Sequence, residues 1–250
     1  SVTGVQTCAL PIFSALRHNL SQIKAAAPDA LVWGVVKADA YGHGIERVFD
    51  ALRAADGLAM LDLAEAERVR QLGWRGPILL LEGAFETRDL ELCSRLNLWH
   101  VVHNEAQIDM LAVHKTHQPH RVFLKMNSGM NRLGFAPQAF RAAWTRLNAL
   151  PQVDEISLMT HFSDADGEKG IAAAVSIFHQ HTHDLSGERS LCNSAASLRH
   201  AKDLAVRADW LRPGIALYGS SPDFPLHSAQ DWGLKPVMSL NANIIAVQHL

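Results

Sequence analysis

The sequence has few cysteines, almost no excess of charge of either sign and no long apolar run. Its three cysteines lie far apart in 250 residues, which gives neither an even disulfide set nor a metal-site spacing and is typical of a reducing cytoplasm. The net charge of −2 does not support a nucleic-acid partner. No apolar run approaches the ~20 residues that a membrane-spanning helix needs. The remaining composition, 48% hydrophobic and 19% charged, is that of a globular protein with a large core.

The two ends of the chain differ from the rest. Residues 1–13 show neither a helical nor a strand period and lack the basic start of a signal peptide, so we expect an atypical segment there. The last residues, VMSLNANIIAVQHL, have the pattern of a strand that ends abruptly. We therefore expect the chain to be a fragment of a longer protein.

Between the ends, apolar runs alternate with amphipathic stretches. Eight runs have the length of strands: residues 31–36, 58–61, 78–81, 98–102, 122–126, 156–160, 190–192 and 209–211. Helical spacing of apolar residues occurs between most of them, as at 45–55, 64–72, 106–114, 137–150 and 171–185, and in a first segment over 14–27. This alternation predicts parallel strands buried on both faces, and therefore an α/β fold of the (β/α)8 TIM-barrel type. A doubly wound open sheet is the alternative, although no G-x-G-x-x-G follows the first strand.

Polar residues follow the predicted strands at their carboxyl ends, where barrels carry their sites. The first strand leads into Lys37, and a lysine is seldom buried without a partner. The last two loops, NSAAS and RPGIALYG, hold the positions where such barrels often bind phosphate. The hydroxyl of Ser194 and the backbone N–H groups of Gly214 and Ile215 suit an anion. A strand-tip lysine with a phosphate pocket predicts pyridoxal 5′-phosphate, held as a Schiff base.

Five segments, in order along the chain, resemble the bacterial alanine racemases, which are fold-type III pyridoxal-phosphate enzymes. They are VVKADAYGHG (35–44), KMNSGMNRLGF (125–135), MTHFSDAD (159–166), NSAAS (193–197) and DWLRPGIALYG (209–219). The resemblance implies a cytoplasmic enzyme that interconverts L-alanine and D-alanine. The D-alanine would supply peptidoglycan synthesis. It also implies a cofactor-binding barrel over residues 14–232 and a separate β-domain, of which residues 233–250 are the beginning. The full-length protein would be a homodimer whose active site uses both chains.

The resemblance assigns a role to each matching residue. It makes Lys37 the Schiff-base lysine and the acid/base on one face of the substrate Cα, and Arg132 the arginine that contacts the substrate carboxylate. Lys125 matches a lysine that is carbamylated in many members and orients that arginine. The remaining matches contact the cofactor or support it: Tyr41, Ser194, Gly214 and Ile215 at the phosphate, Arg212 at the pyridine nitrogen, and His161 beside Arg212. The second base, a tyrosine from the β-domain of the other subunit, would lie beyond Leu250, so we expect the chain alone to be inactive.

Other interpretations stay open beside this one. One is a non-enzymatic barrel that binds pyridoxal phosphate without a β-domain, and another is a racemase of broader amino-acid specificity. Arg212 has an alternative role as the ion-pair partner of Asp209 at the rim of the barrel. We expect no metal site, because no clean ligand set accompanies the histidines, which include a cluster at 179, 181 and 183.

Overall fold

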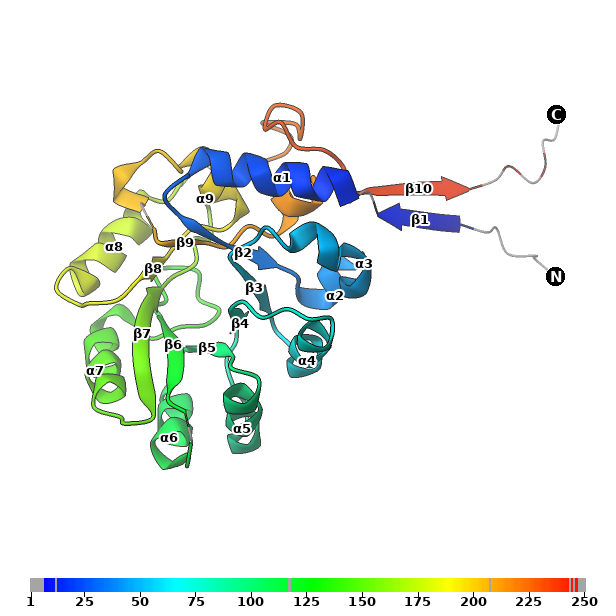
Figure 1. The fold of residues 1–250 in the computed structure, drawn as a ribbon. Helices are drawn as coiled ribbons and strands as arrows, with labels where there is room; N and C mark the ends of the chain where they lie inside the picture. The colour runs from blue at the N-terminus through cyan, green and yellow to red at the C-terminus, as the bar shows by residue number, and fades with distance from the viewer. Residues whose placement is uncertain are drawn as a thin grey trace.

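The computed structural model describes residues 7–242 except 12, 117 and 207, together with residues 244 and 246. Its centre is a sheet of eight strands in the order β8-β7-β6-β5-β4-β3-β2-β9, and every neighbouring pair is parallel (Figure 1). The strands are β2 (Leu31–Val35), β3 (Gly57–Met60), β4 (Ile78–Leu80), β5 (Trp99–Val102), β6 (His120–Lys125), β7 (Val153–Met159), β8 (Arg189–Ser190) and β9 (Trp210–Leu211). All eight predicted strands are therefore confirmed.

The edge strands β8 and β9 meet and close the sheet into a barrel. The N–H of Asp209 donates to the carbonyl of Arg189, and the N–H of Arg212 donates to the carbonyl of Cys192, both at 2.9 Å. Closure means that every strand has two neighbours and that all carboxyl ends lie on one rim. The (β/α)8 TIM-type barrel is confirmed, and the open doubly wound sheet is wrong.

Helices surround the barrel on its outer side (Figure 1). They are α1 (Phe13–Ala26), α3 (Ile45–Val48), α4 (Leu63–Gln71), α5 (Thr87–Arg95), α6 (Glu105–Val113), α7 (Pro137–Asn148), α8 (Ala172–Thr182) and α9 (Ser194–Arg199). Side-chain caps define several starts, as where Asp62 accepts the N–H of Ala64 at 2.6 Å at the beginning of α4. The helix predicted over 45–55 is instead α3 followed by the 3₁₀ turn η1 (Phe49–Leu52). In the described part of the chain, no helix is long and apolar enough to cross a membrane.

Aromatic side chains fill the inside of the barrel. Trp33 stacks on Trp210 with ring centroids 4.2 Å apart, and Trp99 and Phe123 meet Trp33 edge-on at 5.5 and 6.1 Å. Gly57 makes room for this cluster, since a Cβ there would lie 2.2 Å from the Trp33 ring. The filled interior has no space for a ligand at this level, which leaves the rim at the carboxyl ends of the strands for a site.

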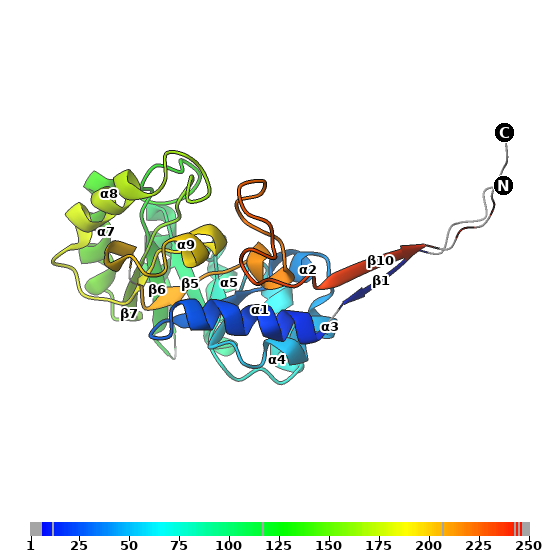
Figure 2. The same ribbon diagram turned by 90° about the horizontal axis from the view of Figure 1, so that it is seen from above.

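A two-stranded sheet projects away from the barrel in both views (Figures 1 and 2). Strand β1 (Thr7–Pro11) pairs antiparallel with β10 (Met238–Ala242), with Thr7 opposite Ala242. Residues 1–13 show no strand period in the sequence, yet β1 forms within them, because this strand depends on a partner more than 200 residues away rather than on its own pattern. Residues 1–6, 12, 243, 245 and 247–250 lie outside the described residues, and the domain boundaries at 13/14 and 232/233 stay predictions.

Three buried histidines cluster beside β5 and β6. The ring centroid of His120 lies 5.1 Å from that of His100 and 5.3 Å from that of His114. Burial, with a smaller contribution from the neighbouring rings, lowers the pKa of His100 to about 3 and that of His120 to about 4. Both imidazoles are therefore neutral in the folded protein at neutral pH.

We expect the free energy of unfolding to fall as the pH drops below about 6.5, the ordinary histidine pKa, because the unfolded chain then binds protons that the folded cluster excludes. Each such histidine contributes a slope of up to about 1.4 kcal/mol per pH unit in this range. Urea unfolding measured between pH 7.5 and 5 gives the unfolding free energy at each pH. This free energy should change less with pH in His100→Phe than in the parent chain. The exposed His183→Phe is the matched control, and equal slopes in all three proteins would contradict this account.

Candidate functional site

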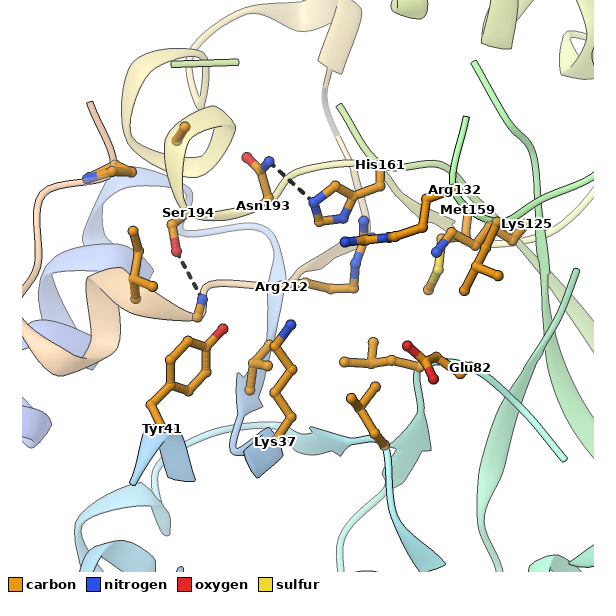
Figure 3. Close-up of a pocket in the computed structure, with 18 of the residues that line it drawn as sticks. Lys37, Tyr41, Glu82, Lys125, Arg132, Met159, His161, Asn193, Ser194 and Arg212 are labelled. Carbon is orange, nitrogen blue, oxygen red and sulfur yellow. Dashed lines mark hydrogen bonds between the residues drawn. The ribbon is translucent and has the colours of Figure 1, made fainter. Parts of the chain in front are cut away.

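A cavity of about 270 Å³ opens at the carboxyl ends of the barrel strands. Every residue to which the resemblance assigned a role lines it: Lys37, Tyr41, Lys125, Arg132, His161, Ser194, Arg212, Gly214 and Ile215. Figure 3 shows side chains from both ends of the barrel sequence pointing into this one space. The fold thus brings together groups that are up to 178 positions apart, from Lys37 to Ile215.

Lys37 and Tyr41 enter the cavity from the two ends of an unusual backbone turn. The segment labelled α2 (Lys37–Tyr41) follows β2, and residues 38 to 41 have φ angles of 53°, 52°, 55° and 54°. These are left-handed helical angles, which cost an L-residue roughly 1–2 kcal/mol each. The turn places the Nζ of Lys37 5.9 Å from the centroid of the Tyr41 ring, and both side chains face the cavity (Figure 3). Backbone strain held at a site in this way points to a functional constraint.

An oxygen-binding turn lines the cavity beside Lys37, at the end of the neighbouring strand β9. The N–H groups of Gly214 and Ala216 both donate to the hydroxyl oxygen of Ser194, at 2.9 and 3.3 Å. A Cβ at Gly214 would lie 2.2 Å from the Tyr41 hydroxyl, so a larger residue would displace the Tyr41 side chain. Two N–H groups converging on one oxygen are suited to an anion. Ala216 was not among the predicted residues, although it lies only one position beyond Ile215 in the same short turn η3 (Ile215–Tyr218).

Arg212 is a buried cation at the end of β9. It donates to the hydroxyl of Ser190 at 2.5 Å, to the carbonyl of Thr160 at 2.6 Å and to that of Leu191 at 3.4 Å. Burial lowers the pKa of Arg212 to about 10, so the guanidinium keeps its charge at neutral pH. The alternative pairing with Asp209 is wrong, because that carboxylate accepts the N–H of Arg189 at 2.7 Å instead.

Burial and the positive charges around the cavity lower the pKa of two further groups. Burial, and then the charges of Arg212 and Arg132, lower the pKa of Lys125 to about 8. Burial, and then the charge of Arg212, lower the pKa of His161 to about 2, so its imidazole is neutral. The Nε2 atom of His161 lies 3.5 Å from the amide nitrogen of Asn193. A cavity with this charge balance favours an anionic ligand.

Two carboxylates also line the cavity, Glu82 and Asp166. Glu82 follows β4, and its carbonyl accepts hydrogen bonds from Gln107 at 3.0 Å and from His103 at 3.1 Å. Its charge raises the pKa of Lys125 against the effect of the arginines. The sequence placed Glu82 at a strand end, but a single acid at a rim is too common to indicate a role. Within the described residues, no group of three or more His, Cys, Asp or Glu side chains is arranged to hold a metal ion.

The fold and the cavity define a (β/α)8-barrel protein with a lysine-containing, cation-rich pocket at the carboxyl ends of its strands. Residues 13–222 match the family model of the alanine racemase N-terminal domain, and the chain belongs to this family. The family match includes the four segments quoted above that carry Lys37, Arg132, His161 and Arg212.

Individual relatives agree with the family. The chain is 75% identical over 236 residues to the alanine racemase of Methylibium petroleiphilum, an overlap that covers 94% of this chain and 64% of that protein. Its fold is similar to that of the biosynthetic alanine racemase from Pseudomonas aeruginosa, with a TM-score of 0.88 and 43% identity over 94% of this chain and 65% of that one. The alanine racemase from Acinetobacter baumannii has a TM-score of 0.92 and 32% identity, over 99% and 69% of the two chains. The chain thus spans 64% of the length of the Methylibium protein.

Lys125 should react as an amine at lower pH than an ordinary lysine, because its neutral form predominates above a pKa of about 8. We expect the rate of its acetylation by acetic anhydride, followed by mass spectrometry, to rise with a midpoint near that pH. Glu82→Gln removes the charge that raises this pKa, so the midpoint should move lower. The exposed Lys169 in the same sample calibrates the reagent, and an unmoved midpoint in Glu82→Gln would contradict the electrostatic account.

Proposed function

We propose that the whole protein is an alanine racemase, interconverting L-alanine and D-alanine, and that this chain forms its cofactor-binding barrel. One observation carries the proposal: a strand-tip lysine and a backbone anion site line a single cavity, in a chain of the alanine racemase N-terminal domain family. D-Alanine made in this way would supply peptidoglycan synthesis.

Pyridoxal 5′-phosphate is the cofactor of this family, and the groups around the cavity fit it. A phosphate needs N–H donors: those of Gly214 and Ala216, which here donate to the Ser194 hydroxyl, would turn to it, beside the hydroxyls of Ser194 and Tyr41. An aldehyde needs an amine, which Lys37 offers at the tip of β2. When bound, the cofactor would draw electrons from the Cα–H bond of the amino acid joined to it, which makes that proton acidic.

The roles of the remaining residues follow from their charge and hydrogen-bonding capacity. Lys37 would move a proton at one face of the substrate Cα, and Arg132 would bind the substrate carboxylate as a fixed cation. Arg212 has donors and no acceptor, so it can only donate to the ring nitrogen of the cofactor and cannot hold a proton on it. His161 lies in the field of Arg212 as a neutral imidazole and would support its orientation.

Lys125 would act through Arg132. Its lowered pKa raises the share of neutral amine at neutral pH, and the neutral amine is the form that adds carbon dioxide. A carbamate on Lys125 would carry a negative charge beside Arg132 and would orient the guanidinium through charge-assisted hydrogen bonds.

Racemisation needs a proton donor or acceptor on each face of the Cα plane. Lys37 serves one face, and we place the second base, a tyrosine, in a β-domain contributed by the other subunit of a homodimer. The relatives have room for such a domain, since the match covers 64% of the Methylibium protein. The proposal also places the protein in the cytoplasm, where its substrate alanine is available.

The two other functions differ from this one in what they require. A non-enzymatic barrel would need only the phosphate site and Lys37, whereas the family match extends to residues in the Arg132 and His161 segments. A racemase of broader specificity would use the same cavity with larger amino acids. A panel of amino acids with longer side chains separates that function from alanine racemisation.

Sodium borohydride should fix pyridoxal phosphate to one peptide of the chain, the one that contains Lys37. The reason is that Lys37 follows β2, which pairs with the β9 strand that leads into the Gly214 turn, whereas Lys125 ends β6 and has Arg212 and Arg132 among the charges that act on it. Peptide mapping after reduction measures the site of attachment. Lys37→Ala should remove the label while Lys169→Ala should not, and a label on any other lysine would refute the assignment.

The whole protein should racemise alanine in a coupled D-alanine assay. We expect residues 1–250 alone to be slower by about 10²–10⁴-fold, because removing one positioned proton donor or acceptor has an effect of this order. Lys37→Ala in the whole protein should lose racemisation as well. Equal turnover by the chain alone would mean that both bases lie inside the barrel, and an inactive whole protein that still binds the cofactor would favour the non-enzymatic function.

A further inference from the structure

The left-handed turn between Lys37 and Tyr41 has to be held from outside, because its own residues do not favour it. None of residues 38 to 41 is glycine, yet all four have positive φ angles. Within the turn, Ala40 donates its N–H to Val36 at 2.8 Å, and Gly42 donates to Ala38 at 3.0 Å. Equivalent bonds form in a right-handed turn as well, so they do not select the left-handed form.

A buried glutamate on a neighbouring helix contacts the middle of this turn. Glu65 lies in the first turn of α4 and is 8% exposed. Its Oε1 atom accepts the N–H of Asp39 at 2.6 Å, while its Oε2 atom has no hydrogen-bond partner in the described part of the chain. Burying a carboxylate with one oxygen unpaired costs free energy. We therefore expect the hydrogen bond of the other oxygen to have a structural role. Burial raises the pKa of Glu65, and the bond from Asp39 opposes this shift.

The side chain of Asp39 makes further contacts that link the turn to α4. Its Oδ1 atom accepts the N–H of Ile45 at 3.1 Å and lies 3.2 Å from the guanidinium of Arg68, which is also on α4. Helix α4 therefore holds Asp39 at its backbone through Glu65 and at its carboxylate through Arg68. The second contact is half exposed, so the first is the stronger constraint.

On the other side, the turn rests against Tyr218. The ring of Tyr218 lies 4.8 Å from that of Tyr41, and its hydroxyl donates to the carbonyl of Val35 at 3.1 Å, just before Lys37. Burial, then the charge of Tyr41 and then that of Glu65, raise the pKa of Tyr218. The turn is thus clamped between α4 and η3, and the hydrogen bond to Asp39 is the contact that fixes its middle.

We infer that Glu65 is a positioning residue for the site: as the acceptor for the Asp39 N–H, it holds the left-handed turn that presents Lys37 and Tyr41 to the cavity. Glu65 does not line that cavity, so it acts only through the turn. The inference builds on the proposed function, because the turn matters for catalysis only if Lys37 and Tyr41 do. The holding of the turn itself can be measured without any cofactor.

Three substitutions of Glu65 distinguish the effect of its hydrogen-bond acceptor from the effect of its negative charge. Glu65→Gln keeps an oxygen at the same reach and removes the charge, whereas Glu65→Asp keeps the charge and shortens the reach by one methylene. Glu65→Leu removes both. The same changes at Glu67 are the matched control, because Glu67 is exposed on the same helix and pairs with Arg95 at 3.3 Å, away from the turn.

The first measurement is amide hydrogen exchange of the peptide containing residues 37–44 in the chain without cofactor, relative to a β6 peptide in the same molecule. Glu65→Asp and Glu65→Leu should speed exchange in the turn about tenfold or more, the order expected when a hydrogen bond to a charged group is lost. Glu65→Gln and the Glu67 variants should stay near the parent chain. Normalising to β6 makes the result independent of any general loss of stability.

The second measurement adds pyridoxal phosphate and quantifies borohydride trapping at Lys37. The Asp and Leu variants should need about tenfold more cofactor for half-maximal trapping, whereas the Gln variant should need the parental amount. The inference is overturned if Glu65→Gln disturbs the turn as much as Glu65→Leu, or if Glu65→Asp leaves it unchanged. Failure of the proposed function gives a different result: no trapping in any variant, with the exchange pattern still as expected.

Discussion

The hydrogen bonds of the Arg212 guanidinium join the parts of the barrel on which the cavity depends. Arg212 lies at the end of β9, and it donates to Ser190 in β8, to Thr160 after β7 and to Leu191 after β8. These contacts occur where the barrel closes, so one side chain fixes the ends of three strands relative to one another. All its acceptors named here are neutral, and a buried cation among neutral groups is less favourable than a well-packed apolar side chain. A buried arginine at this place is explained if its positive charge is needed at the rim of the barrel, where a ligand would bind.

Arg212 also sets the protonation of its surroundings. Together with burial, it keeps His161 neutral and lowers the pKa of Lys125 to about 8. A neutral imidazole can donate through one nitrogen and accept through the other, whereas a protonated one could only donate. The cavity is therefore preorganised for negative charge, and the phosphate and carboxylates of the proposed ligands would supply it. Glu82, which also lines the cavity, limits this effect, since its charge acts on Lys125 in the other direction.

Backbone conformation shapes the cavity in addition to charge. The turn after β2 is left-handed over four residues that are not glycine, and Gly214 allows the backbone after the neighbouring strand β9 to approach the Tyr41 hydroxyl. Both features sit at the ends of strands held by the closed barrel, which supplies the rigidity that the strained turn after β2 requires. This part of the cavity is thus set by main-chain geometry, and the side chains of Lys37 and Tyr41 depend on it.

The sequence by itself determined the barrel and the residues at its rim. Strand and helix periods are local, and burial on both faces leaves a visible apolar run, so the eight strands could be found without a structure. Parallel topology then put Lys37, Arg132, His161 and Arg212 at one rim, and the motifs around them indicated the family. Only the tertiary structure decided the pairing of β1 with β10, the hand of the turn after Lys37, and the part played by Glu65 and the N–H of Ala216. The tertiary structure also decided the lowered pKa values of Lys125 and His161. Each of these depends on groups distant in sequence that meet within a few ångströms, and such contacts leave no periodic trace in the chain.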